Sequence, residues 1–191
     1  MTRGRAGKPA EANFGQPRFG GAIMLQTIAS FRALLAAIAL LLAGNGLLAT
    51  LLALRANAAG FSLQTTGLVL AFYHLGFILG SLRASRFISR VGHIRAFAAF
   101  AAIASSAALA HSLAIAPLPW MALRFLSGAA MAGLFMVAES WLNERASGAL
   151  RGQLLSVYMV VNLGGVAIGQ LLLAIGDPLG FELFALAALL A

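Results

Sequence analysis

The chain has 191 residues, of which 61% are apolar and only 9% are charged, whereas an average soluble domain carries roughly 25% charged residues. A soluble chain of this length cannot bury so much apolar surface in its own core, which excludes an ordinary water-soluble enzyme or binding domain. The chain contains no cysteine, so disulfides and thiolate metal sites are excluded too. We expect no cofactor and no metal.

Apolar stretches of about 20 residues, the length that crosses a bilayer as a helix, recur along the chain. They predict an all-α membrane protein with five complete transmembrane helices and the start of a sixth. The expected helices cover about residues 33–54, 65–84, 96–116, 120–142, 152–176 and 181–191. Turns are marked by "APLPW" after the third stretch and by "GDPLG" after the fifth. Because the last stretch is half the length of a spanning helix, we expect a fragment of a longer protein.

Residues 1–30 are polar, basic and rich in glycine and proline, which predicts a disordered tail. Met24 is a second candidate start. Positive residues gather in this tail and in the connections near residues 85–95 and 145–151, which the spans place on one side of the membrane. Such residues prefer the cytoplasmic side, so the N-terminus is predicted to be cytoplasmic. This placement explains the net charge of +8 without nucleic acid as a partner.

Small residues at four-residue spacing predict close contacts between helices, because they let the backbones approach. The second, fourth and fifth stretches carry glycine at this spacing, the first carries two nearby glycines, and the third carries no glycine. The residues are Gly44, Gly46, Gly76, Gly80, Ala84, Gly128, Ala132, Gly165 and Gly169. We therefore expect these four helices to form an inner set and the third helix to be peripheral. The alternative is that glycine is simply common in membrane helices.

Four polar residues lie inside the same four stretches, namely Asn45, His74, Asn162 and Gln170. Polar side chains at membrane depth usually face the bundle interior or a water-filled path, and a histidine exchanges protons near neutral pH. We treat all four as candidates for a substrate or proton pathway. The alternative for each is an interhelical hydrogen bond that only stabilises the bundle.

Arg124 and Glu139 are the charged residues of the fourth stretch. They are 15 residues apart, about 22 Å along a helix axis, and lie broadly on one face. The alternative for each is that the charged group reaches its own membrane interface. For Arg124 this alternative is weaker, because positive residues are scarce on the expected outer side. Glu182 is its candidate partner there.

With these residues in place, the sequence resembles the amino-terminal six-helix half of the major facilitator superfamily, a twelve-helix fold. The stretch "SRFISRVGHIR", residues 85–95, is similar to the loop pattern G-x-L-x-D-R-x-G-R-R. Arg90, Gly92 and Arg95 fit this pattern, but Ser89 stands where an acidic residue is usual. "RFLSGAAMAG", from Arg124, resembles the family's helix-four pattern. Residues 139–173 resemble a poorly characterised branch from the bacterial inner membrane.

The resemblance implies a secondary transporter that moves a small solute by alternating access, and we expect it to be coupled to protons. It implies a role in coupling or binding for Arg124. It also implies a charge latch at the loop, and we expect this latch to be weakened because Ser89 has no negative charge. The predicted latch residues are Ser89, Arg90, Gly92, Arg95, Glu139 and Glu144, the two glutamates being candidate partners of the arginines.

Two other functions remain open. An intramembrane protease needs a serine beside a histidine, and Ser127 with His74 or His111 is the candidate set. An inactive fragment or scaffold is the other alternative. The expected partners are membrane lipid, an unknown small-molecule substrate, protons, and either the carboxyl-terminal half of the same chain or a dimer partner.

Overall fold

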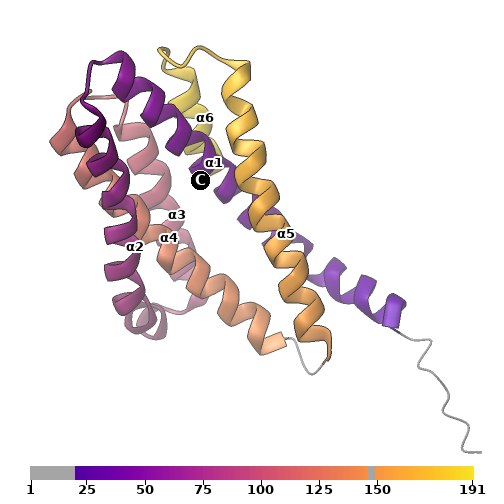
Figure 1. The fold of residues 1–191 in the computed structure, drawn as a ribbon. Coiled ribbons are helices and arrows are strands. Elements are labelled where there is room, and N and C mark those ends of the chain that lie inside the picture. Colours follow the sequence, from indigo (N-terminus) through magenta and orange to yellow (C-terminus); the bar gives the residue numbers. More distant parts are fainter. Residues whose placement is uncertain (1–19, 146–148) are drawn as a thin grey trace, which may run out of the picture.

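The computed structural model describes residues 20–145 and 149–191, which form a bundle of helices without any strand (Figure 1). The helices are α1 (Gly20–Ala58), α2 (Leu63–Val91), α3 (His93–Ala110), α4 (Pro117–Arg145), α5 (Ala149–Leu172), a short 3-10 turn (Leu173–Ile175) and α6 (Glu182–Leu190). Helices α1 to α5 each contain a stretch long and apolar enough to cross a membrane. The expected fold class, an all-α membrane bundle, is therefore confirmed.

The first helix begins earlier than the sequence predicts. α1 starts at Gly20, so residues 20–30, which we expected in a disordered tail, are helical. After Gly21 this segment contains no glycine or proline, and it joins the apolar stretch directly. Adding residues to an existing helix costs far less than nucleating a new one, which accounts for the extension. The remainder of the predicted tail, residues 1–19, lies outside the described residues.

The helices pack in two close pairs. α2 lies along α4, and α1 lies along α5 (Figure 1). α3 covers another side of α4 and also contacts α6, which in turn packs on α1. Ser105 links α3 to α6, because its hydroxyl donates a hydrogen bond to the carbonyl oxygen of Ala188 in α6 at 2.6 Å.

Glycines make both close pairs possible, as predicted. Gly76 of α2 lies directly against the Phe125 backbone of α4, and Gly128 of α4 lies against the Tyr73 backbone of α2. A Cβ atom at either glycine would overlap a carbonyl oxygen of the partner helix. The α1–α5 pair is built in the same way, with Gly169 against the Ala43 backbone.

The expected inner set needs a correction. More than half of the most apolar stretch is buried in α1 and in α4, whereas less than a quarter is buried in α2, α3 and α5. The bundle therefore has two central helices rather than four, and α3 is no more peripheral than α2 or α5. Glycine spacing missed this difference, because it reports a close approach along one face of a helix and not the burial of its other faces.

Short polar contacts hold the end of the bundle that carries the α1–α2 and α5–α6 connections. Arg55, near the end of α1, donates a hydrogen bond to the Pro178 carbonyl oxygen at 3.3 Å. The carboxylate of Asp177 accepts one from the Leu179 amide at 2.9 Å, which forms the turn predicted at "GDPLG". Trp120 is fully buried at the same end, and its ring nitrogen donates to the His111 carbonyl oxygen at 3.0 Å.

Candidate functional site

Arg124 is buried in the bundle. It lies in the third turn of α4, only 3% of its surface is exposed, and its guanidinium carbon sits 4.4 Å from the centre of the Tyr73 ring. The electron-rich face of an aromatic ring stabilises a cation placed over it. The Nε and Nη1 atoms have no hydrogen-bond partner in the part of the chain that the structure describes. The guanidinium therefore keeps donors free for a further group.

Tyr73 links Arg124 to a third helix. The close approach of α2 and α4 at Gly128 brings the Tyr73 backbone against α4, which places the ring beside Arg124. The Tyr73 hydroxyl also lies near the side chain of Asn45 in α1. Asn45, Tyr73 and Arg124 thus form one polar group, contributed by α1, α2 and α4, inside the apolar bundle.

The expected acidic partner of Arg124 is absent from this group. Glu182 begins α6 and is exposed, and no ion pair joins it to Arg124 within the part of the chain that the structure describes. Among the described residues, the guanidinium of Arg124 faces the Tyr73 ring and not a carboxylate. The sequence could not show this, because it gives no information on which of two distant segments approaches the arginine.

A second polar region lies on the other half of α4. A cavity of about 410 Å³ opens between α2, α4 and α5, and Glu139, Tyr158 and Asn162 are among its lining residues. Asn162 donates a hydrogen bond to the Tyr158 carbonyl oxygen of its own helix at 2.8 Å. Glu139 is exposed to the cavity, and it forms no ion pair with Arg90 or Arg95 in the described residues.

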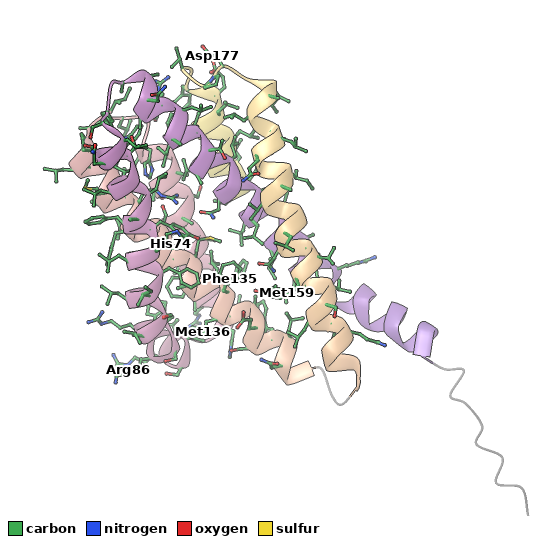
Figure 2. All side chains as sticks on the ribbon, in the orientation of Figure 1. His74, Arg86, Phe135, Met136, Met159 and Asp177 are labelled. Carbon is green, nitrogen blue, oxygen red and sulfur yellow. The ribbon has the colours of Figure 1, made fainter. Side chains whose placement is uncertain are left out.

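Two pathway candidates, His74 and Gln170, have exposed side chains and belong to neither polar region. His74 is exposed on α2, and its ring meets the adjacent Tyr73 ring edge-on at 5.4 Å between centres. Figure 2 shows His74 on α2 and the cavity residues Phe135 and Met159 between α4 and α5. Gln170 is exposed near the end of α5. Of the five candidates, only Asn45 and Arg124 belong to one group.

The junction of α2 and α3 brings Ser89 and Arg90 at the end of α2, Gly92, and Arg95 at the start of α3 close together in sequence. Gly92 has φ +85°, a conformation that side-chain-bearing residues rarely adopt, and it is the single residue between the two helices. The Ser89 hydroxyl donates to the Arg86 carbonyl oxygen of its own helix at 3.0 Å. Arg90 and Arg95 are exposed. The side chain of Glu144 lies outside the described residues.

The geometry does not assemble the serine–histidine pair of a protease. The Ser127 hydroxyl donates to the Leu123 carbonyl oxygen one turn earlier at 2.9 Å. The His111 ring donates from Nδ1 to the Ala107 carbonyl oxygen at 2.6 Å. Among the described residues, neither His74 nor His111 forms a hydrogen bond with Ser127.

Sequence reasoning missed the two tyrosines that complete these regions. Tyr73 and Tyr158 are the only tyrosines of the chain, and both lie inside predicted membrane helices. A buried tyrosine normally needs a hydrogen-bond partner for its hydroxyl. Membrane tyrosines usually gather at the interfaces. A tyrosine inside an apolar stretch could therefore have been recognised as a candidate polar-site residue.

Comparisons with known proteins agree with these features. A model of the Major Facilitator Superfamily matches residues 33–191. The chain is 37% identical over 109 residues to an uncharacterized MFS-type transporter of Yersinia pestis, an alignment that covers 57% of this chain and 28% of the relative. It is 32% identical over 108 residues to an uncharacterized MFS-type transporter of Enterobacter, which covers 56% of this chain and 28% of the relative.

The aligned part therefore spans a little over a quarter of the length of these curated relatives. No solved structure matches the chain significantly. The family match covers all five spanning helices from residue 33 onward and includes both polar regions. The chain is a multi-pass membrane protein that belongs to the Major Facilitator Superfamily.

Proposed function

We propose that the chain forms part of a secondary transporter that moves a small solute by alternating access and couples this movement to protons. The observation that carries the proposal is the buried guanidinium of Arg124, which has free donors and no carboxylate partner among the described residues. Charged groups at membrane depth are costly and are retained mainly at sites of transport. A guanidinium also stays protonated in proteins, so Arg124 supplies a fixed positive charge through the whole cycle.

The position of the Arg124 charge is compatible with a bundle that moves during the transport cycle. Arg124, Tyr73 and Asn45 come from α4, α2 and α1, and alternating access needs a bundle that rocks as one body around its site. A cation held over a ring face is less firmly fixed than a cation paired with a carboxylate. Arg124 is therefore free to engage an anionic group of the substrate or of the carboxyl-terminal half and to release it later in the cycle.

The test uses the native full-length protein in liposomes with an imposed pH gradient. A mixture of small solutes is offered outside, and mass spectrometry identifies any solute that accumulates inside. We expect at least one solute to accumulate in a manner that a protonophore abolishes. If no solute accumulates above the level of protein-free liposomes with either gradient direction, the proposed transport function is wrong. Accumulation that resists the protonophore contradicts the proton coupling alone.

The proposed location is the bacterial inner membrane, with the N-terminus in the cytoplasm. The exposed arginines at the end of α2 and at the start of α3 support this orientation, because positive residues prefer the cytoplasmic side. The chain has no cysteine of its own, so single cysteines report sidedness cleanly. In intact cells, a membrane-impermeant maleimide is expected to label Ala59→Cys and not Ser89→Cys. The reverse pattern contradicts the orientation.

We also propose that the loop between α2 and α3 is a weakened latch. Ser89 bonds only its own helix and leaves Arg90 and Arg95 without an acidic neighbour at that position. Ser89→Asp restores a negative charge and is expected to raise the population closed on the loop side about two- to fivefold, the size of an exposed ion pair. The measurement is a spectroscopic distance across that side of the full-length protein. Ser85→Asp, one turn earlier and equally exposed, is the control, and an equal response of both variants rejects the latch.

A further inference from the structure

Among the described residues that line the cavity between α2, α4 and α5, one side chain is charged, the carboxylate of Glu139. The same described lining includes no arginine or lysine that could neutralise it. Arg124 lies on the same helix but about 22 Å away along the axis, at 1.5 Å per residue. The cavity therefore carries an unbalanced negative charge, and a bound cation is the group that balances it.

The other residues that line the cavity are mainly aromatic and apolar, which indicates a cation with an apolar body. Phe77 and Phe135 meet edge-on with 5.9 Å between ring centres, and both face the cavity. Met136 and Met159 line it from α4 and α5, and Figure 2 shows Phe135 and Met159 on either side of the space between these helices. Aromatic faces attract cations, and methionines adapt to apolar shapes.

A buried hydroxyl supports a ligand at the same place independently. Tyr158 is only 4% exposed, and its hydroxyl has no hydrogen-bond partner among the described side chains. The hydroxyl lies near Glu139 and Asn162 but meets neither in good hydrogen-bond geometry. A buried polar atom without a partner is costly, and this one borders the cavity, where a ligand satisfies it.

An organic cation fits the lining better than a metal ion. Calcium and magnesium require about six or more oxygen ligands, and in the described ranges no cluster of three His, Asp or Glu residues exists that could hold a metal. The volume of about 410 Å³ falls within the roughly 300–1,000 Å³ of pockets that take drug-sized molecules.

We propose that this cavity binds a lipophilic organic cation, with Glu139 as its counter-charge and Phe77, Phe135 and Met159 around its apolar body. The inference rests on the proposed transport function, because it names the substrate class that enters from the Glu139 half of α4. It assigns different tasks to the two charged residues of that helix. Glu139 holds the cationic substrate, and Arg124 acts on the other half of the bundle.

The test is direct binding of radiolabelled tetraphenylphosphonium to the full-length protein in nanodiscs. We expect saturable binding, and we expect Glu139→Gln to weaken it about tenfold or more, the cost of losing one charged partner. Glu139→Asp keeps the charge and is expected to retain most of the affinity. Glu182→Gln, an exposed glutamate on α6 outside the cavity, is the matched control and leaves binding unchanged.

Two further measurements keep the result interpretable if Glu139→Gln folds poorly. Phe135→Leu keeps an apolar side chain but removes a ring face, and it is expected to weaken binding about threefold or more. Tetraphenylborate, an anion of the same shape, is expected to bind the wild type much more weakly than tetraphenylphosphonium does. Absence of saturable tetraphenylphosphonium binding, or equal binding of the two ions, overturns the proposal.

This outcome is separable from the fate of the proposed function. If the liposomes accumulate a solute but the protein does not bind tetraphenylphosphonium, the cation site is wrong and transport stands. If the cation binds with the expected dependence on Glu139 while no solute accumulates, the site stands and the transport function is wrong.

Discussion

Gly128→Ala is expected to lower the free energy of unfolding by about 3 kcal/mol, the upper range for overpacking a tight interior. The added Cβ overlaps the Tyr73 carbonyl oxygen, and a backbone atom cannot move aside as a flexible side chain does. α2 and α4 must therefore separate along their closest contact. The measurement is the thermal or denaturant unfolding of the purified protein in detergent.

Gly67→Ala is the matched control. Gly67 lies in α2, the partner helix of α4, but no atom of another helix lies within 4 Å of a Cβ built there. Alanine favours a helix interior over glycine by about 0.5–1 kcal/mol, so Gly67→Ala is expected to leave stability unchanged or to raise it slightly. Equal losses in both variants would show that helical glycines matter here for a reason other than the α2–α4 contact.

The same glycine connects packing to the polar group. At Gly128 the Tyr73 backbone contacts α4, and the Arg124 guanidinium lies over the Tyr73 ring. A separation of the two helices therefore moves the ring away from the cation. We expect Gly128→Ala to impair transport more than its loss of folded protein explains.

Much of the fold follows from patterns that are local in the sequence. The spanning helices are predictable because a bilayer requires about 20 apolar residues, and the turn at Asp177 is predictable from its residue types. The packed faces of Gly76, Gly128 and Gly169 are predictable from spacing, since few other residues permit such close backbones.

The centre of the bundle is not predictable in this way. α1 and α4 are more buried than α2 and α5, although all four helices carry closely spaced glycines or alanines. Which helices are enclosed depends on the arrangement of the whole set, and hydropathy in a membrane protein does not distinguish a lipid-facing surface from a protein-facing one.

The candidate site is predictable only in part, for the same reason. Arg124 stands out because a charge in an apolar stretch is unusual, and Asn45 stands out in the same way. Their link through Tyr73 depends on three helices meeting at one depth, which no single stretch encodes. His74 was equally unusual in the sequence, yet its ring lies on the exposed side of α2.

Arg124→Lys is expected to reduce solute accumulation in the liposome assay about tenfold or more. Lysine keeps the positive charge, but it loses the planar group that stacks on the Tyr73 ring and the donors that remain free on Nε and Nη1. Arg124→Gln removes the charge as well and is expected to abolish accumulation. Arg83→Lys, an exposed residue of α2, is the control and should transport normally.

Tyr73 variants separate the ring face from the hydroxyl. Tyr73→Phe keeps the aromatic face under Arg124 and loses only the hydroxyl beside Asn45, so we expect a fewfold loss at most, as for a single neutral hydrogen bond. Tyr73→Leu removes the face and is expected to approach the effect of Arg124→Lys. Similar losses for both tyrosine variants would show that the phenol, and not the cation–ring contact, matters for transport.

A purely structural role for Arg124 makes a different prediction. Removing a buried charge that only stabilises the bundle lowers the unfolding temperature and the yield, while the folded protein that remains transports at the wild-type rate. The accumulation rate must therefore be divided by the amount of folded protein recovered from the liposomes. If Arg124→Gln transports normally on this scale, the guanidinium belongs to the packing of α2 against α4 and not to the transport cycle.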